Sequence, residues 1–296
     1  MNQALRRGIR LAQIGLVVNG ILAMVKLVAG ILGHSYALIA DAVESVADLF
    51  GSLIVWGGLR LSSRDADTRY PFGYGKAEAV SAATVGMLLC GAAIGIAIEA
   101  VREILTPHHA PAPFTLVVLV LVVAVKETLF RFVLKGAEQI GSQAVAADAW
   151  HHRADAITST AAFLGISIAL IGGPGWEESD DWAALGASLL ILYNGVTILR
   201  PALQELMDRS PNEELLLAVD RAAQAVEGVR ATEKLRARKS GTRFLLELHV
   251  QADPSLTLHD AHILSGKVKH AILRAVPSVQ YVLVHMEPFA PVNGER

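Results

Sequence analysis

Six long apolar segments fill most of the first two thirds of the chain, and they limit its possible folds more than any other feature. A helix needs roughly 20 mostly apolar residues to cross a bilayer. The overall composition agrees, since 53% of the residues are hydrophobic and only 18% are charged. The sequence therefore predicts an all-α, six-helix transmembrane domain over residues 1–209. The six predicted spans lie at about 10–32, 36–60, 78–105, 114–135, 144–171 and 181–204.

The loops between these segments differ in charge. Arg or Lys residues stand before the first segment, between the second and third, and at the ends of the fourth and sixth. The opposite loops, at 33–35, 106–113 and 172–181, have no Arg or Lys in the sequence. Because Lys and Arg concentrate in cytoplasmic loops, both termini are expected on the cytoplasmic side of the cell inner (plasma) membrane.

Residues 210–296 lack such segments and predict a small cytoplasmic α/β domain with the element order αββαβ. Apolar and polar residues alternate along the second strand, as expected for a half-buried strand. Ser210 is the predicted N-cap of the first helix. Thr257 and Asp260 resemble a capping box that opens the second. The predicted helices cover about 211–226 and 257–275, and the strands about 230–238, 242–251 and 279–287.

Ionisable residues interrupt two of the apolar segments with matching spacing. His151 and Asp155 stand at i and i+4, as do Glu44 and Asp48, so each pair shares one face of a helix. Ionisable side chains at membrane depth cost roughly 2.5–3.5 kcal/mol each on insertion scales, which makes them candidates for function. Two such helices can bring three carboxylates and one imidazole to a single cation.

Four more polar residues at membrane depth receive lesser roles. Asp41 is expected on the outer side of this four-residue set and Asp148 on the cytoplasmic side, where both would line the pathway. Lys26 is expected to make hydrogen bonds between helices, and Lys126 to join a structural ion network.

The charge of the four-residue set suggests a coupling to protons. Three ionised carboxylates without a cation are unfavourable at low dielectric, so protons should bind when metal leaves. The imidazole favours Zn²⁺ or Fe²⁺ over Mg²⁺ or Ca²⁺, while Mn²⁺, Co²⁺ and Cd²⁺ stay possible. The sequence has no nucleotide-binding motif, so proton antiport is expected, with metal as substrate and regulatory ligand and no organic cofactor.

Five of the ten histidines lie in the C-terminal domain. His249, His285 and Glu287 stand on predicted strands and are candidates for a second metal site, with His262 closing it from the helix. The alternative is a polar surface with scattered histidines.

Together, the acidic stripe at 41–48, the loop at 70–78, the polar stretch at 147–155 and the α/β tail resemble the cation diffusion facilitator family. The resemblance covers nearly the whole chain and implies a bacterial, homodimeric exporter of divalent metals of the zinc/iron type, not an enzyme. The loop metal site of some members is expected to be absent or weak, because Tyr70 and Tyr74 stand at its histidine positions and only Asp67 remains. The resemblance implies three sets of residues: transport ligands Glu44, Asp48, His151 and Asp155; cytoplasmic ligands His249, His262, His285 and Glu287, with Glu233 at a further histidine position; and an interface salt bridge between Lys76 and Asp208.

Three other functions would leave different signatures. An intramembrane metalloprotease would need a metal-binding motif such as His-Glu-x-x-His, which the sequence lacks. A passive cation channel would carry metal independently of a proton gradient. A membrane-anchored metal sensor would bind metal in its tail without flux. The net charge of −2 and the pI near 6.6 do not suggest a nucleic-acid partner.

Overall fold

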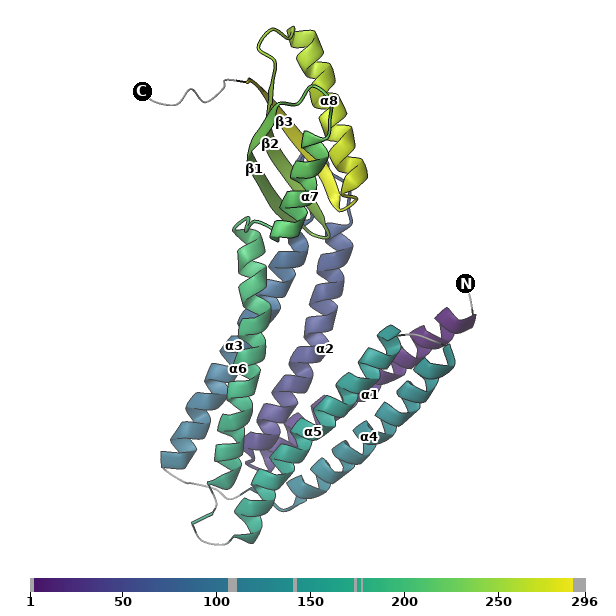
Figure 1. The fold of residues 1–296 in the computed structure, drawn as a ribbon. Coiled ribbons are helices and arrows are strands. Elements are labelled where there is room, and N and C mark those ends of the chain that lie inside the picture. Colours follow the sequence, from purple (N-terminus) through teal and green to yellow (C-terminus); the bar gives the residue numbers. More distant parts are fainter. Residues whose placement is uncertain (1–2, 106–110, 141–142, 173–174, 177, 290–296) are drawn as a thin grey trace. The chain divides into compact units, whose positions relative to one another are not determined.

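The computed structural model describes residues 3–105, 111–140, 143–172, 175–176 and 178–289. Six long helices come first along the chain, followed by a small α/β part, which confirms the predicted fold class (Figure 1). Among the described residues, three helical segments, Gln13–Leu32, Lys76–Leu105 and Ser179–Leu206, are long and apolar enough to cross a membrane, so the count of six spans stays a prediction. The six helices are α1 Gln3–Leu32, α2 Tyr36–Ser62, α3 Lys76–Leu105, α4 Phe114–Ile140, α5 Gln143–Ile171 and α6 Ser179–Leu206.

The chain divides into two compact units. The first, called the helical unit here, comprises residues 1–54 and 84–199. The second, called the sheet unit, comprises residues 55–83 and 200–296. The predicted domain boundary at 209/210 stays a prediction.

In the helical unit, α1, α4 and α5 pack side by side (Figure 1). Small residues let α3 approach α6 closely. A Cβ added at Gly86 would lie 2.8 Å from the Cβ of Leu199, and one at Gly195 would lie 2.8 Å from Sγ of Cys90. Small residues of this kind allow tight contacts between helices in a bilayer, where the hydrophobic effect does not drive helix association.

A buried carboxylate joins the starts of α2 and α6. The Ser35 hydroxyl donates a 2.7 Å hydrogen bond to Asp180 Oδ1, and the Tyr36 backbone N–H donates a 2.8 Å bond to Oδ2. Asp180 therefore caps α2 from another helix, in the way that a local Asp satisfies free N–H groups at a helix start. This contact fixes the beginning of the helix that carries Glu44 and Asp48.

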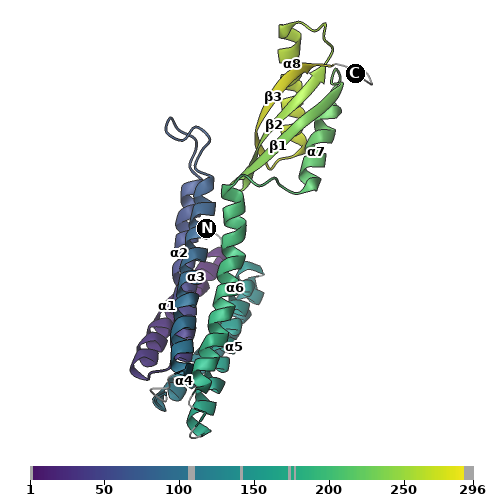
Figure 2. The same ribbon diagram turned by 90° about the vertical axis from the view of Figure 1, so that its left-hand side faces the viewer.

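The sheet unit contains a three-stranded mixed sheet in the order β1-β2-β3. The β1/β2 pair is antiparallel and the β2/β3 pair is parallel. Helices α7 and α8 cover one face, and Figure 2 shows the strands in front of them. Leu246 of β2 and Ile272 of α8 are completely buried between the layers. The elements are α7 Glu213–Gln224, β1 Ala231–Ser240, β2 Arg243–Ala252, α8 Leu258–Ala275 and β3 Val279–Pro288.

The ends of these helices and strands can be compared with the helix caps and strand boundaries predicted from the sequence. The Thr257 side chain accepts a hydrogen bond from the Asp260 N–H at 3.2 Å, so the predicted cap of α8 is confirmed. The predicted cap at Ser210 is wrong, because Asn212 occupies the N-cap with an extended backbone. Two glutamates then fill the first turn, where the helix dipole favours negative charge. β1 also runs two residues further than predicted, and Gly241, with φ of 63°, forms the turn to β2.

Replacing Ile272 with alanine should destabilise the sheet unit by about 2–5 kcal/mol, because it leaves a cavity between α8 and the sheet. Hydrogen exchange of the β2 amides in the full chain would measure the loss. Ile263→Ala is a suitable control, since Ile263 lies on the same helix and is 45% exposed. Equal losses for both variants would contradict the placement of the core.

Candidate metal sites

The acidic residues of α2 lie near an acidic residue of α5. Glu44 and Asp48 are partly buried on α2. Glu44 is close enough to Asp48, Asp41 and Asp155 to interact with each of them electrostatically. The structure therefore places carboxylates from two helices of the helical unit within electrostatic range of one another. Their role as metal ligands stays a prediction.

Two predicted residues of α5 are described only in part. The backbone at Asp148 and His151 is helical, while their side chains lie outside the described residues. His152 is almost completely buried, and its Nδ1 lies 3.2 Å from Nδ2 of Asn19 on α1. The face of α5 next to the predicted ligand face therefore packs on α1.

Asp155 is bound to a lysine of the neighbouring helix. Lys126 Nζ on α4 lies 2.7 Å from Asp155 Oδ2. The lysine side chain is 1% exposed and the aspartate side chain 13% exposed. An ion pair between helices agrees with the ion network predicted for Lys126, but its partner is one of the four predicted transport ligands.

A second buried lysine lies in the same region. Lys26 Nζ donates hydrogen bonds to Ser45 Oγ at 2.6 Å and to the Asp41 carbonyl at 3.0 Å. It also lies 3.0 Å from Asp41 Oδ2, which accepts a hydrogen bond from Ser159 Oγ at 2.8 Å. These bonds join α1, α2 and α5, as the predicted helix-to-helix role of Lys26 requires. The pathway role of Asp41 and Asp148 stays a prediction.

The C-terminal candidates meet on the sheet. Parallel pairing places His249 beside His285, and Glu287 follows two residues later on the same face of β3. One possible ligand atom from each of the three residues lies within 4.8 Å of the others. Glu287 Oε1 is 2.6 Å from His249 Nδ1 and 3.7 Å from His285 Nε2. Ligand atoms held roughly 2.0–2.2 Å from one tetrahedral Zn²⁺ lie about 3.5 Å apart, so small side-chain movements would bring these atoms to one ion.

The two remaining C-terminal candidates, Glu233 and His262, lie outside this three-residue cluster. Glu233 is the β1 partner of His249 in the sheet register, and Lys234 Nζ lies 3.0 Å from its Oε1 and 3.6 Å from Glu287 Oε1. The hydrogen bond from His249 lowers the pKa of Glu287. His262 is exposed on α8 and is not in the three-residue cluster found among the described residues. Glu233 and His262 stay predicted ligands.

In the loop after α2, the Asp67 side chain makes hydrogen bonds within the loop itself. Asp67 Oδ1 accepts hydrogen bonds from the Arg69 and Tyr70 N–H groups, each at 2.8 Å, and Oδ2 accepts one from the Tyr74 hydroxyl at 2.6 Å. The bond from Tyr74 is the main cause that lowers the pKa of Asp67. The carboxylate therefore shapes its own turn, as Asp commonly does in loops.

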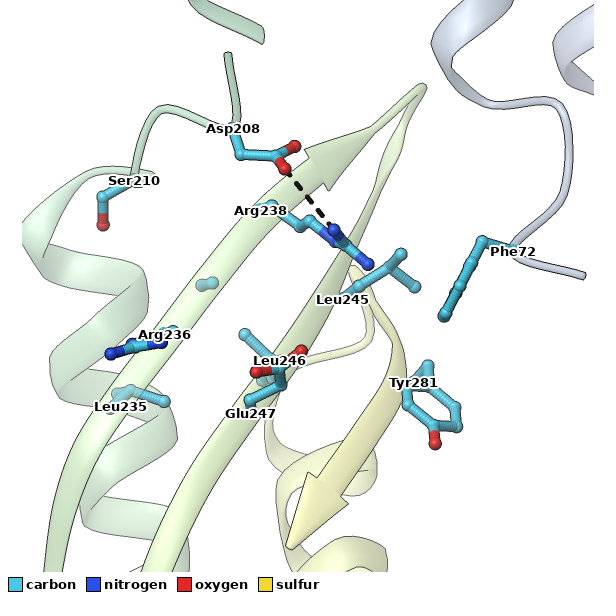
Figure 3. A pocket seen from close by; sticks show the side chains of 11 residues that line it. Phe72, Asp208, Ser210, Leu235, Arg236, Arg238, Leu245, Leu246, Glu247 and Tyr281 are labelled. Atoms are coloured by element: carbon cyan, nitrogen blue, oxygen red, sulfur yellow. Dashed lines mark hydrogen bonds and ion pairs between the residues drawn. The ribbon is translucent and has the colours of Figure 1, made fainter. Parts of the chain in front are cut away.

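Lys76 and Asp208 form an ion pair within the sheet unit, with 2.6 Å between Nζ and Oδ1. Arg238 approaches the other carboxylate oxygen at 3.4 Å and stacks over the Phe72 ring at 5.3 Å. Figure 3 shows Asp208, Arg238 and Phe72 around a pocket of about 400 Å³ next to the strands, which Tyr281 also lines. The predicted role of the Lys76–Asp208 pair at a dimer interface stays a prediction.

The Lys76–Asp208 pair should give a small, pH-dependent stabilisation. The hydrogen bond from Lys76 lowers the pKa of Asp208, so the stabilisation is present at neutral pH and is lost as the pH falls through the lowered pKa. Because both side chains are about 40% exposed, we expect Asp208→Asn to cost less than about 1 kcal/mol at neutral pH. Thermal unfolding of both proteins as a function of pH checks this. A difference that does not shrink as the pH falls below the usual range for an aspartate would contradict an electrostatic origin.

Comparison with known proteins identifies the class. Residues 12–207 match the family model described as the cation efflux transmembrane domain, and residues 211–289 match the cation efflux protein cytoplasmic domain. The chain is thus a membrane protein of the cation efflux class. It belongs to the cation diffusion facilitator family.

Curated relatives align over nearly their full lengths. The manganese efflux system protein MneP of Bacillus subtilis is 31% identical over 284 residues, which cover 95% of this chain and 96% of MneP. The magnetosome protein MamB of Paramagnetospirillum magneticum is 31% identical, with 93% and 92% covered. The cation-efflux pump FieF of Escherichia coli is 30% identical, with 100% and 99% covered.

Family membership confirms several predictions at a coarse level. The chain is a transporter of divalent metals and not an enzyme, which removes the metalloprotease alternative. The cytoplasmic domain match indicates the dimerisation typical of the family. The cluster on the sheet supplies a potential metal site in that domain.

Proposed function

We propose that this protein is a secondary antiporter in the cell inner membrane, with both termini in the cytoplasm. As a homodimer, it exports a divalent transition metal in exchange for protons by alternating access. The observation that supports this most strongly is the grouping of Glu44, Asp48 and Asp155 from two helices of the helical unit. Carboxylates of this kind at membrane depth mark ion pathways.

The transported metal would be bound by these three carboxylates and by His151. An imidazole beside carboxylates favours Zn²⁺ or Fe²⁺, with Mn²⁺, Co²⁺ and Cd²⁺ as further candidates. Mn²⁺ has additional support because one relative is named as a manganese efflux protein. Metal and protons compete for the same carboxylates, since a metal ligand must be deprotonated. This competition would couple metal efflux to proton entry.

His249, His285 and Glu287 would hold a regulatory metal, with His262 and Glu233 as further ligands. Support comes from the short distances among the first three residues. The Lys76–Asp208 pair would hold the helices together at the cytoplasmic face of the dimer. Metal bound in the tail would stabilise the dimer and raise activity.

Transport into proteoliposomes under an imposed pH gradient tests this function. Zn²⁺, Fe²⁺, Mn²⁺ and Cd²⁺ would be compared in parallel, with and without the gradient. Antiport predicts metal flux that depends on the gradient, together with an opposite movement of protons. Flux that ignores the gradient would support a passive channel. Metal binding without flux would support a membrane-anchored sensor.

A further inference from the structure

Lys126 occupies an unusual position for a lysine at membrane depth. Its side chain is 1% exposed, and its ammonium lies 2.7 Å from Asp155 Oδ2. Burying a charged lysine costs desolvation free energy, which an opposite charge paired with it offsets. The pairing explains why the lysine is tolerated, but it also places a positive charge on a predicted metal ligand.

The ammonium and a divalent cation have the same requirement at Asp155. Both need a negatively charged oxygen, and they repel each other at short range. A metal coordinated by Asp155 would therefore weaken the bond to Lys126 or displace its ammonium from Oδ2. The lysine side chain is a flexible four-carbon stem, so its head group can move without a change in the helix.

The surroundings contain other charges that act on Lys126. Lys26 lies within electrostatic range of both Lys126 and Asp155, and its own partner is Asp41. Two lysines thus stand beside the acidic residues of α2 and α5. Of these two lysines, Lys126 pairs with one of the four predicted ligands, whereas Lys26 pairs with Asp41.

We propose that Lys126 is a positioning residue that acts as an internal competitor of the transported metal. Its ammonium pairs with Asp155 and is displaced by the metal, so it weakens metal affinity and keeps the buried carboxylate paired after release. A carrier gains from such a group, because a site that binds too tightly releases its cargo slowly. This proposal rests on the transport site proposed above.

Metal binding by the full chain in detergent tests the competition. All proteins would carry His249→Ala and His285→Ala to remove the cluster on the sheet, and Zn²⁺ and Mn²⁺ would be titrated calorimetrically. Lys126→Met should tighten the apparent Kd by about tenfold, within the range usual for coupled sites. It should also enlarge the rise in melting temperature that Zn²⁺ produces. Lys126→Arg, which keeps the charge, should bind metal about as weakly as the parent.

Lys26→Met is the matched control, since Lys26 is equally buried but pairs with Asp41. It should change the Kd by less than Lys126→Met does. If Lys126→Met does not fold, Lys126→Gln replaces it, because the amide can still donate to Asp155 without carrying charge.

The outcomes separate this proposal from the transport site on which it rests. Unchanged or weaker binding by the neutral Lys126 variants, while Asp155→Asn abolishes binding, would overturn the competitor role and leave the site intact. Wild-type binding by Asp155→Asn would overturn the site itself, and the competitor role with it. Equal tightening by Lys26→Met and Lys126→Met would also overturn direct competition, because it would reflect a general loss of positive charge.

Discussion

Metal flux into proteoliposomes should fall by about 100-fold or more when Asp155 is replaced with alanine, because the change removes a ligand from the proposed transport site. The same change leaves Lys126 buried without the carboxylate that it binds at 2.7 Å. Breaking a buried pair in this way typically costs about 3–5 kcal/mol, so part of any loss could come from poor folding. Asp155→Asn separates the two effects, since the amide oxygen can still accept a hydrogen bond from Lys126.

The expected result is therefore a folded Asp155→Asn protein without transport. Glu127→Gln supplies the control, because Glu127 lies next to Lys126 on α4 but forms a local pair with Arg131, whose side chain is 75% exposed. Its flux should stay close to that of the wild type. Full flux through Asp155→Asn, with normal incorporation into the vesicles, would contradict the assignment of the site.

Much of the fold followed from the order of residues along the chain. The length of the apolar segments predicts long helices, and the alternation of apolar and polar residues predicts β2. Both patterns reflect which surfaces of an element lie away from water. The cap at Thr257 is also local, since its hydroxyl bonds a backbone group three residues away. The start of α7 was less predictable. Ser210 and Asn212 can both cap a helix, and the choice depends on how the chain leaves α6.

The candidate sites show the same division between local and long-range information. Spacing alone pairs Glu44 with Asp48, because both lie on one helix. The contact between Lys126 and Asp155 depends on how α4 and α5 are rotated against each other, which no spacing within either helix specifies. The neighbouring charges at Lys126 and Glu127 gave the signal that partners must exist. The sequence could not tell that one partner would be a predicted ligand.

The register of the sheet likewise needed the structure. His249 and His285 are far apart in the sequence, and a shift of one residue in the β2/β3 pairing would move one of them to the opposite face. In the observed register they are direct neighbours, with ring centroids 4.6 Å apart. A cluster that depends on pairing between distant strands can be suggested by composition but is positioned only by the fold.

Replacing His249 and His285 together with alanine should weaken Zn²⁺ binding by the tail about 100-fold or more, because two of the three clustered ligands are lost. The full chain would carry Asp155→Asn, so that the proposed transport site does not contribute to the measurement. Calorimetric titration with Zn²⁺ then reports the tail alone. Glu287 would remain as a single carboxylate, which is a weak Zn²⁺ ligand without nitrogen partners.

The domain offers a matched pair of histidines for the control. His259 and His270 lie on α8 and are exposed, and His270 Nδ1 lies 2.7 Å from the Gly266 carbonyl of its own helix. Alanine at both positions removes the same number of imidazoles but should leave Zn²⁺ affinity unchanged. Equal losses in the two double variants would mean that scattered surface histidines bind the metal, as the alternative interpretation of the sequence holds. A loss confined to His249 and His285 would tie binding to the register of β2 and β3, since only that pairing brings the two rings together.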